Sequence, residues 1–468
     1  MHIIIVGAGV TGMELAHRLI VKKHTVVLIE KNEETARHAA NRLDCAVTQA
    51  SGNDPQVLKD AHIHKTDALV AVTDSDELNM IICGVVESMA PQVLKIARVR
   101  NENYVISLNT VQERMLGIDF LVHPDQEAAQ AIMNAVEYGA VSDIVAFENS
   151  PYQLICFTIE KDSRFDGLAL CDIRSVIHKD ISFVIVSVEE QGMASIPSGQ
   201  TVLHTGMRIS ILCLPADIEQ FYMLAGCEIK PIKKIALVGI GKIGSRVASA
   251  LTHQRTFKLF AKLFGKSVKR YQELTIIDKN DALAKYAAEN YPDAQVYRGD
   301  VTDESFIEEI DLKSFDLVIT ATQNYELNMI TATYFKTLGI RKTITLVQSA
   351  TMSNIAYKIG IDVAIPFKDV TVDTIMSHLG GRNLTRIHTM GSGSLEIVEI
   401  TIGNESGLAG KALKEIAPNG MFLILLITHE AVCRIPDGNT ILAVNDKLVV
   451  ITQVSYSDQI IKEFAGEE

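Results

Sequence analysis

Short apolar runs alternate with amphipathic stretches through the first part of the chain. His2 to Val6 forms a strand-like apolar run, and apolar residues recur at helical spacing from Met13 to Ile20. Runs rich in β-branched residues, Leu69 to Thr73 and Val93 to Val99, also alternate with helical patterns up to about residue 139. Strands that alternate with helices are typical of an α/β fold with a doubly wound parallel sheet. We therefore expect such a lobe at the start of the chain.

The pattern then changes to closely spaced strands. Between Val141 and Pro215, and again between Ser394 and Thr452, short alternating runs such as Phe183 to Val188 are separated by Pro-Ser-Gly and Pro-Asp-Gly turns. Met421 to Ile427 is the most apolar run and is too short to cross a membrane. These segments predict two small α+β lobes.

The chain is an internal duplication. HIIIVGAGVTG begins at His2, and KIALVGIGKIG begins at Lys234, 232 residues later. The motif TDSDELN at Thr73 likewise returns as TQNYELN at Thr322. We predict four lobes, namely 1–139 and 232–388 with doubly wound sheets and 140–225 and 389–468 with α+β folds. Pro215 to Lys234 is the candidate linker.

The second copy contains an insertion of 16 residues between Leu251 and Gln272. The segment is basic and amphipathic, with Phe257, Phe260 and Phe264 near one face at helical spacing. It is either a solvated extension of the helix or a surface for a membrane or an acidic partner.

Each copy has a G-x-G-x-x-G motif between an apolar strand and a helical pattern. In the Rossmann fold the first glycine permits a tight turn, the second lets backbone N–H groups approach a pyrophosphate, and the third lets the helix pack against the strand. The phosphates then lie at the positive end of the helix. The glycines concerned are Gly7, Gly9 and Gly12 in the first copy and Gly239, Gly241 and Gly244 in the second.

A carboxylate ends the second strand of each copy. Glu30 and Asp278 are expected to accept the two hydroxyls of an adenosine ribose and to repel a 2′-phosphate. This arrangement favours NAD(H) over NADP(H). The alternative is that one or both loops preserve the fold and bind nothing.

Other candidates follow later strands. Asp300 and its counterpart Asn53 line the adenine side or are turn residues, and Thr73 and Thr322 contact the cofactor or cap helices. Arg98 and Arg100 end the fifth strand of copy one, as a phosphate clamp or as a solvated pair. The second copy has Leu346 and Gln348 there, so its site is expected to be weaker; Lys242 in its glycine loop would restore part of the charge.

Composition narrows the function. The 468 residues include 44 basic and 57 acidic side chains, and the net charge of −13 argues against broad binding to nucleic acid. Seven scattered cysteines suggest buried reduced thiols, and the N-terminus lacks a secretory signal, so we expect a cytosolic protein. His62 and His64 are expected in a helix-to-strand connection. No metal site, P-loop or acid–base pair is found, which favours a binding protein over an enzyme.

The two glycine loops, the repeated Thr-x-x-x-Glu-x-Asn, Arg98-Val-Arg100 and the Ile-Pro-x-Gly turns together resemble the TrkA family. Its members are cytosolic regulators of Trk-type potassium uptake with tandem RCK (KTN) domains. The resemblance covers essentially the whole chain, and the basic insertion departs from it.

The resemblance implies a non-catalytic gating ring, a homotetramer beneath an integral-membrane potassium transporter subunit of Trk type. It implies regulation by NAD(H) and, in relatives, ATP or ADP. Alternatives are an NAD-dependent oxidoreductase with a duplicated Rossmann core, and a DNA-binding redox sensor, which the charge disfavours. By position, the first site would include Gly7, Ala8, Gly9, Val10, Thr11, Glu30, Thr73, Asp74 and Arg98, and the second Gly239, Ile240, Gly241, Lys242, Ile243 and Asp278.

Overall fold

The computed structural model describes residues 1–104, 115–137, 145–147, 150–177, 181–190, 193–226, 232–252, 273–310, 314–379, 384–390, 394–416, 421–430 and 432–466. They form two compact units, Met1–Ala128 with Phe367–Gly381, and Ala129–Pro366 with Arg382–Glu468. Among these residues, no helix combines the length and the apolar character needed to cross a membrane.

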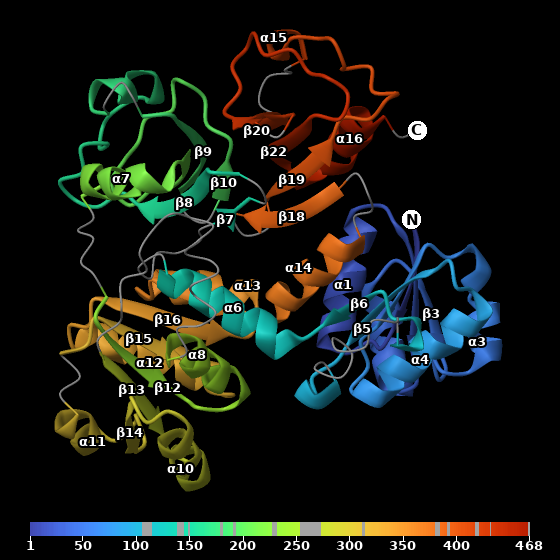
Figure 1. Ribbon diagram of the computed structural model, residues 1–468, viewed down its shortest axis with the longest axis horizontal. Helices are drawn as coiled ribbons and strands as arrows, with labels where there is room; N and C mark the ends of the chain where they lie inside the picture. The colour runs from blue at the N-terminus through green and yellow to red at the C-terminus, as the bar shows by residue number, and fades with distance from the viewer. Residues whose placement is uncertain are drawn as a thin grey trace. The chain divides into compact units, whose positions relative to one another are not determined.

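A six-stranded parallel sheet forms the centre of the first unit (Figure 1). Its order, 3-2-1-4-5-6, is that of the Rossmann fold, so the carboxyl ends of all strands meet at one edge. In this order the strands are β3 (Ala46–Gln49), β2 (Thr25–Glu30), β1 (His2–Val6), β4 (Ala68–Ala71), β5 (Leu94–Arg98) and β6 (Phe120–Val122). Along the chain, the helices of this copy are α1 (Val10–Val21), α2 (Glu33–Arg42), α3 (Pro55–Asp60), α4 (Asp76–Met89) and α6 (Pro124–Glu137).

The two faces of this sheet have separate cores, because successive residues of a strand point to opposite faces. On β1, Ile4 packs with residues of α4, whereas Ile3 packs with residues of α1. A helix from the second copy, α14 (Phe367–Leu379), completes the α1 face. Its side chains at Val372 and Ile375 are fully buried there. Fifteen residues of copy two thus belong to the core unit of copy one.

Ion pairs join α1 to α14 beside this apolar contact. Arg18 on α1 pairs with Asp369 and with Asp373, the latter at 2.6 Å, and also with Glu14 one turn before it at 2.9 Å. Lys368 pairs with Glu14 at 3.0 Å. Burial alone would raise the pKa of Glu14, but hydrogen bonds from Arg18 and Lys368 lower it below its usual value. The contact therefore combines apolar packing with a partly buried charge network.

A second six-stranded parallel sheet with the same order lies in the second unit. Its strands, in sheet order, are β14 (Gln295–Arg298), β13 (Glu273–Asp278), β12 (Lys234–Val238), β15 (Leu317–Thr320), β16 (Lys342–Val347) and β17 (Val363–Pro366). Its helices are α8 (Lys242–Thr252), α10 (Asp281–Asn290), α11 (Glu304–Glu309), α12 (Tyr325–Thr337) and α13 (Ala350–Lys358).

Two antiparallel sheets make up the small lobes. The first contains β7 (Val145–Ala146), β8 (Gln153–Thr158), β9 (Phe183–Glu190), β10 (Met193–Ser195) and β11 (Arg208–Cys213), with α7 (Ile218–Leu224). The second contains β18 (Leu384–Met390), β19 (Leu395–Thr401), β20 (Phe422–His429), β21 (Val432–Arg434) and β22 (Lys447–Gln453), with α15 (Leu413–Ile416) and α16 (Val454–Ala465). Leu154 and Leu212 of the first lobe share one apolar cluster with Leu395 and Ile397 of the second.

The predicted fold class and tandem repeat are confirmed. The linker is shorter than predicted, because residues 218–224 form α7 and bury Phe221 in the first small lobe. The four predicted lobe boundaries remain predictions, and α14 lies within the range predicted for the third lobe although it packs in the first unit. Residues 253–272, most of the predicted insertion, lie outside the described residues.

Candidate nucleotide-binding sites

The glycine loops have the same geometry in both copies. Gly7 has φ +107° and Gly239 has φ +94°, conformations that side chains rarely adopt. A Cβ on Gly12 would lie 1.9 Å from the Gly7 carbonyl oxygen, and one on Gly244 equally close to Gly239. These glycines are therefore needed for the turn and for helix packing, as predicted.

The middle glycines differ from the others. A Cβ on Gly9 or on Gly241 would meet nothing within 4 Å. Gly9 is the N-cap of α1 and provides no side-chain cap, so the first turn of this helix has no side-chain acceptor from its N-cap. Open space beside uncapped N–H groups is the arrangement that accepts a phosphate.

Each predicted ribose carboxylate also holds its glycine loop. Glu30 accepts the Ala8 N–H at 2.7 Å through one oxygen and the Asn32 N–H at 2.8 Å through the other. Asp278 accepts the Ile240 N–H at 2.8 Å and the N–H two residues after itself, also at 2.8 Å. Each oxygen keeps a second lone pair, so ribose hydroxyls have acceptors in a fixed orientation.

An asparagine ties the ends of two strands together in both copies. Asn79 accepts the Thr73 N–H at 2.8 Å and donates to the Arg98 carbonyl oxygen at 2.8 Å. Asn328 accepts the Thr322 N–H at 3.0 Å and donates to the Leu346 carbonyl oxygen at 3.1 Å. The sequence presented the motif twice, but its structural role was not predicted.

The threonines of this motif differ from both expectations. The Thr73 hydroxyl lies 2.7 Å from the Asn79 carboxamide oxygen, and the Thr73 N–H is bonded to the same oxygen. The N–H and the hydroxyl hydrogen of Thr73 are therefore already used by a buried amide, and the hydroxyl oxygen keeps acceptor capacity. Nor does Thr73 cap α4, since the Ser75 hydroxyl accepts the Leu78 N–H at 3.1 Å. Thr322 is engaged by Asn328 in the same way.

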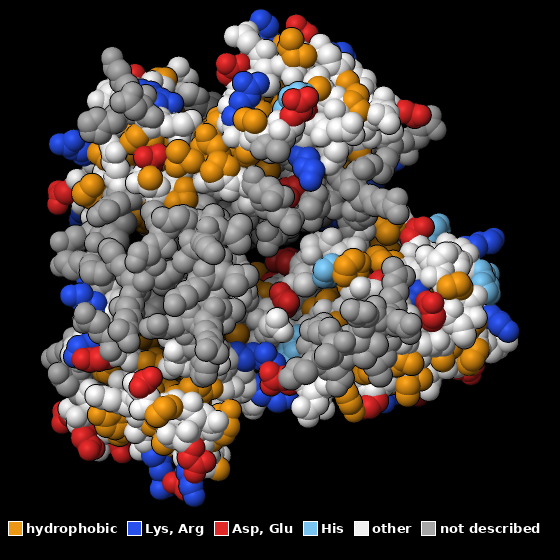
Figure 2. Space-filling view, in the orientation of Figure 1, with side chains coloured by type: hydrophobic (Ala, Val, Ile, Leu, Met, Phe, Trp, Pro, Cys, Tyr) orange, Lys and Arg blue, Asp and Glu red, His pale blue; other side chains and the backbone are white. Residues whose placement is uncertain are grey.

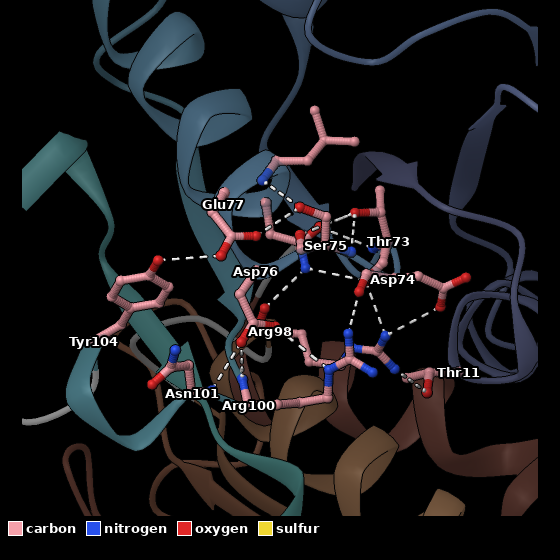
Figure 3. Close-up of polar contacts among 12 residues, drawn as sticks. Thr11, Thr73, Asp74, Ser75, Asp76, Glu77, Arg98, Arg100, Asn101 and Tyr104 are labelled. Atoms are coloured by element: carbon pink, nitrogen blue, oxygen red, sulfur yellow. Dashed lines mark hydrogen bonds and ion pairs between the residues drawn. The ribbon is translucent and has the colours of Figure 1, made fainter.

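Arg98 connects the end of β5 to the first glycine loop (Figure 3). Its guanidinium donates to the Thr73 carbonyl oxygen at 2.9 Å and to the Thr11 hydroxyl at 3.3 Å. Asp74, which is fully exposed, lies 3.7 Å from it. The side chain is 13% exposed, and its Nε is buried with no hydrogen-bond partner among the described residues. Arg98 is therefore a largely buried cation beside the first turn of α1.

Arg100 turns to a different partner. Its Nε lies 3.4 Å from Asp76, and its terminal nitrogen donates to the Asp74 carbonyl oxygen. Burial, and then repulsion by Arg100, lower the pKa of Arg98, although an arginine remains charged at physiological pH. The solvated-pair alternative is therefore wrong for Arg98.

The second copy lacks this arginine cluster. Leu346, which is 1% exposed, has the place of Arg98, and Ile243 has the place of Thr11. Tyr325 replaces Asp76. Lys242 is exposed at the start of α8. The two copies therefore share the loop and the carboxylate but differ in charge next to the glycine loop.

The remaining candidates make local contacts. Asp300 accepts both the N–H and the hydroxyl of Thr302, which is the predicted turn alternative, and these bonds lower its pKa. His62 and His64 lie between α3 and β4, as predicted. Of the described cysteines, Cys171 is exposed, contrary to the expectation that the thiols are buried. No cluster suited to a metal ion is present in the described part of the chain.

Charge on the visible surface is mixed. Figure 2 shows Lys and Arg side chains scattered among Asp and Glu on that face. This distribution accords with the net charge of −13.

Comparisons with known proteins match both kinds of lobe. The TrkA-N domain model matches residues 3–124 and 235–366, and the TrkA-C domain model matches residues 154–226 and 397–465. The chain belongs to the TrkA family. Among TrkA relatives, the Trk system potassium uptake protein TrkA of Haemophilus influenzae is 26% identical over 91% of this chain and 90% of its own. A TrkA homolog of Archaeoglobus fulgidus is 28% identical over 99% of this chain and 100% of its own.

Solved structures show the same fold as this TrkA-family chain. The GsuK channel bound to NAD has a TM-score of 0.57 at 18% identity, covering 100% of this chain and 79% of that one. The GsuK RCK domain has a TM-score of 0.56 at 18% identity, covering 99% and 95%.

Proposed function

We propose that this chain is a non-catalytic, nucleotide-sensing regulatory subunit of a potassium uptake system. It binds NAD(H) and controls an integral-membrane potassium-conducting subunit of Trk type. The observation that carries the proposal is the duplicated site, in which an open glycine loop and an oriented carboxylate occur together twice. The names of the TrkA relatives support the potassium uptake part.

NAD(H) is the proposed ligand because Glu30 and Asp278 provide acceptors for ribose hydroxyls and negative charge against a 2′-phosphate. A similar fold in the GsuK channel bound to NAD supports this choice. ATP or ADP share the adenosine and phosphate groups and are competing ligands in this proposal.

Regulation follows from differential affinity. A nucleotide changes the balance between two shapes of the protein only if it binds one shape more tightly. We infer a homotetrameric ring on the inner face of the cell membrane, held there by the membrane subunit, with no nucleic acid partner.

One experiment separates this function from the oxidoreductase alternative. The purified chain is titrated with NADH, and the recovered nucleotide is assayed for oxidation in the presence of carbonyl compounds. Saturable binding with NADH recovered intact, together with co-purification with a Trk-type membrane subunit, is expected. Turnover of NADH would favour the oxidoreductase and contradict the proposal.

A further inference from the structure

Asp76, at the start of α4, has an unusual set of contacts for a residue in the first turn of a helix. Its carboxylate is 9% exposed and accepts the Arg100 N–H at 2.8 Å and the Asn101 N–H at 2.7 Å. The N-cap role in α4 already belongs to Ser75. The carboxylate therefore accepts hydrogen bonds from the segment that follows β5 and does not cap its own helix.

Two residues of α4 hold the end of β5 and the segment that follows it. Asn79, three positions after Asp76 and on the same helix face, donates to the Arg98 carbonyl oxygen at 2.8 Å. Asp76 accepts the N–H groups of residues 100 and 101. The backbone that follows the Arg98 Cα is thus fixed at three points, the carbonyl oxygen of Arg98 and the N–H groups of Arg100 and Asn101.

Asp76 also pairs with Arg100, whereas Arg98 contacts the glycine loop. The Arg100 Nε lies 3.4 Å from Asp76, and its terminal nitrogen donates to the Asp74 carbonyl oxygen, so the Arg100 guanidinium has partners of its own beside Arg98 (Figure 3). Arg98 then reaches the Thr11 hydroxyl in the first turn of α1. Arg100 has a buried carboxylate partner, whereas Arg98 contacts the Thr11 hydroxyl and has the exposed Asp74 carboxylate 3.7 Å away.

The second copy is an internal comparison for this arrangement. There Asn328 makes the same bonds, and β16 pairs with its neighbours like β5. Tyr325 nevertheless replaces Asp76, and Leu346 replaces Arg98. The strand and the helix form without the aspartate, so the fold does not require it. Asp76 is present in the copy that has the arginine and absent from the copy that lacks it.

We propose that Asp76 is a positioning residue that holds Arg98 over the phosphate position of the first site, so that this site selects ligands by their phosphates. The inference rests on the proposed nucleotide binding and names a residue that acts through Arg98 without touching the ligand. A phosphate-free ligand such as adenosine would not depend on Asp76.

The test uses the full chain with the second site disabled by Gly241→Asp, a position where an added Cβ has open space. NADH binding is followed by the fluorescence of the nucleotide, which no tryptophan of this chain obscures. Adenosine is measured by competition. Asp76→Asn, which keeps the shape of the side chain but removes its charge, is compared with Arg98→Gln and with the double variant.

We expect Asp76→Asn to weaken NADH at least tenfold and to change adenosine affinity less than threefold. The double variant should bind NADH no more weakly than Arg98→Gln alone, because the two residues act as one device. Asp76→Glu, which keeps the charge, should recover part of the affinity and provides the second test if the asparagine variant does not fold. As a matched control, Tyr325→Phe with the first site disabled by Gly9→Asp should leave the second site unchanged.

Equal losses for NADH and adenosine would assign Asp76 a merely structural role and overturn the inference. Additive losses in the double variant would also overturn it. If the chain without these substitutions binds neither NADH nor adenosine, the proposed function itself fails, an outcome that is distinct from the first two.

Discussion

Replacing Arg98 by leucine would give the first site the residue that the second copy has naturally. Asn79 continues to donate to the Thr73 carbonyl oxygen at 3.2 Å, so this acceptor keeps a partner when the guanidinium is removed. Leu346 is accommodated at the equivalent position with 1% exposure. We therefore expect Arg98→Leu to fold and to change ligand binding.

The size of the effect follows from the burial of the guanidinium. Charge-assisted hydrogen bonds contribute about 1.5–3 kcal/mol, and a tenfold change in affinity corresponds to about 1.4 kcal/mol. Arg98 is 13% exposed, so a charge-assisted bond between its exposed guanidinium atoms and a phosphate would form in a largely desolvated place. We expect NADH to bind the first site about 10- to 100-fold more weakly in Arg98→Leu.

The assay is an equilibrium titration with NADH at one salt concentration, with Gly241→Asp present in both proteins. The control is Leu346→Met with Gly9→Asp present, where a volume-conserving change should leave the second site as it was. An affinity of Arg98→Leu within twofold of the parent would refute the clamp role. It would also remove the reason to expect unequal sites.

Three further predictions concern selectivity, packing and pH. Glu30→Gln should reduce the ratio of NADH affinity to NADPH affinity about tenfold, because the charge that repels a 2′-phosphate is lost while the side chain can still accept the Ala8 N–H. An unchanged ratio of affinities would show that Glu30 does not contact the ribose. Ile375→Ala in α14 should destabilise the first unit by about 2–5 kcal/mol, as measured by hydrogen exchange of the β1 amides. Ile355→Ala, at a 46% exposed position, should have little effect, and similar losses of stability in the two variants would contradict the packing of α14 in the first core. Burial, and then the N-terminal charge, lower the pKa of His24 to about 4, so the folded protein favours the neutral ring and should lose stability as pH falls from about 6.5 toward 4. In thermal unfolding, His24→Gln should reduce the dependence of stability on pH in this range. The same dependence in both proteins would show that His24 is not the group responsible.

Local patterns were sufficient to predict the glycine loops, their carboxylates and the alternating strands. Gly12 is determined by a contact with the Gly7 carbonyl oxygen in the same turn, and Gly7 by its positive φ, so the glycine spacing already specifies their geometry. Arg98 was also a candidate, because the ends of parallel strands meet at one edge of the sheet.

Contacts distant in sequence could not be predicted in this way. The place of α14 depends on a face of the first sheet that α1 leaves uncovered, and no residue pattern within α14 states which copy it joins. The bonds that occupy the Thr73 hydroxyl come from a side chain six residues later, and a motif alone does not say which groups are already paired. Asp76 was likewise missed, since its partners are backbone N–H groups 24 and 25 residues away.

The difference in NADH affinity between the two sites can be measured directly by titrating the Gly9→Asp and Gly241→Asp variants with NADH. At both positions a new side chain has space, but it would fill the pyrophosphate position and place a negative charge at the start of the helix. We expect Gly9→Asp to remove a class of sites that binds NADH tightly and Gly241→Asp to remove a class that binds it more weakly. A folded Gly9→Asp protein that binds NADH with unchanged affinity and stoichiometry would contradict it.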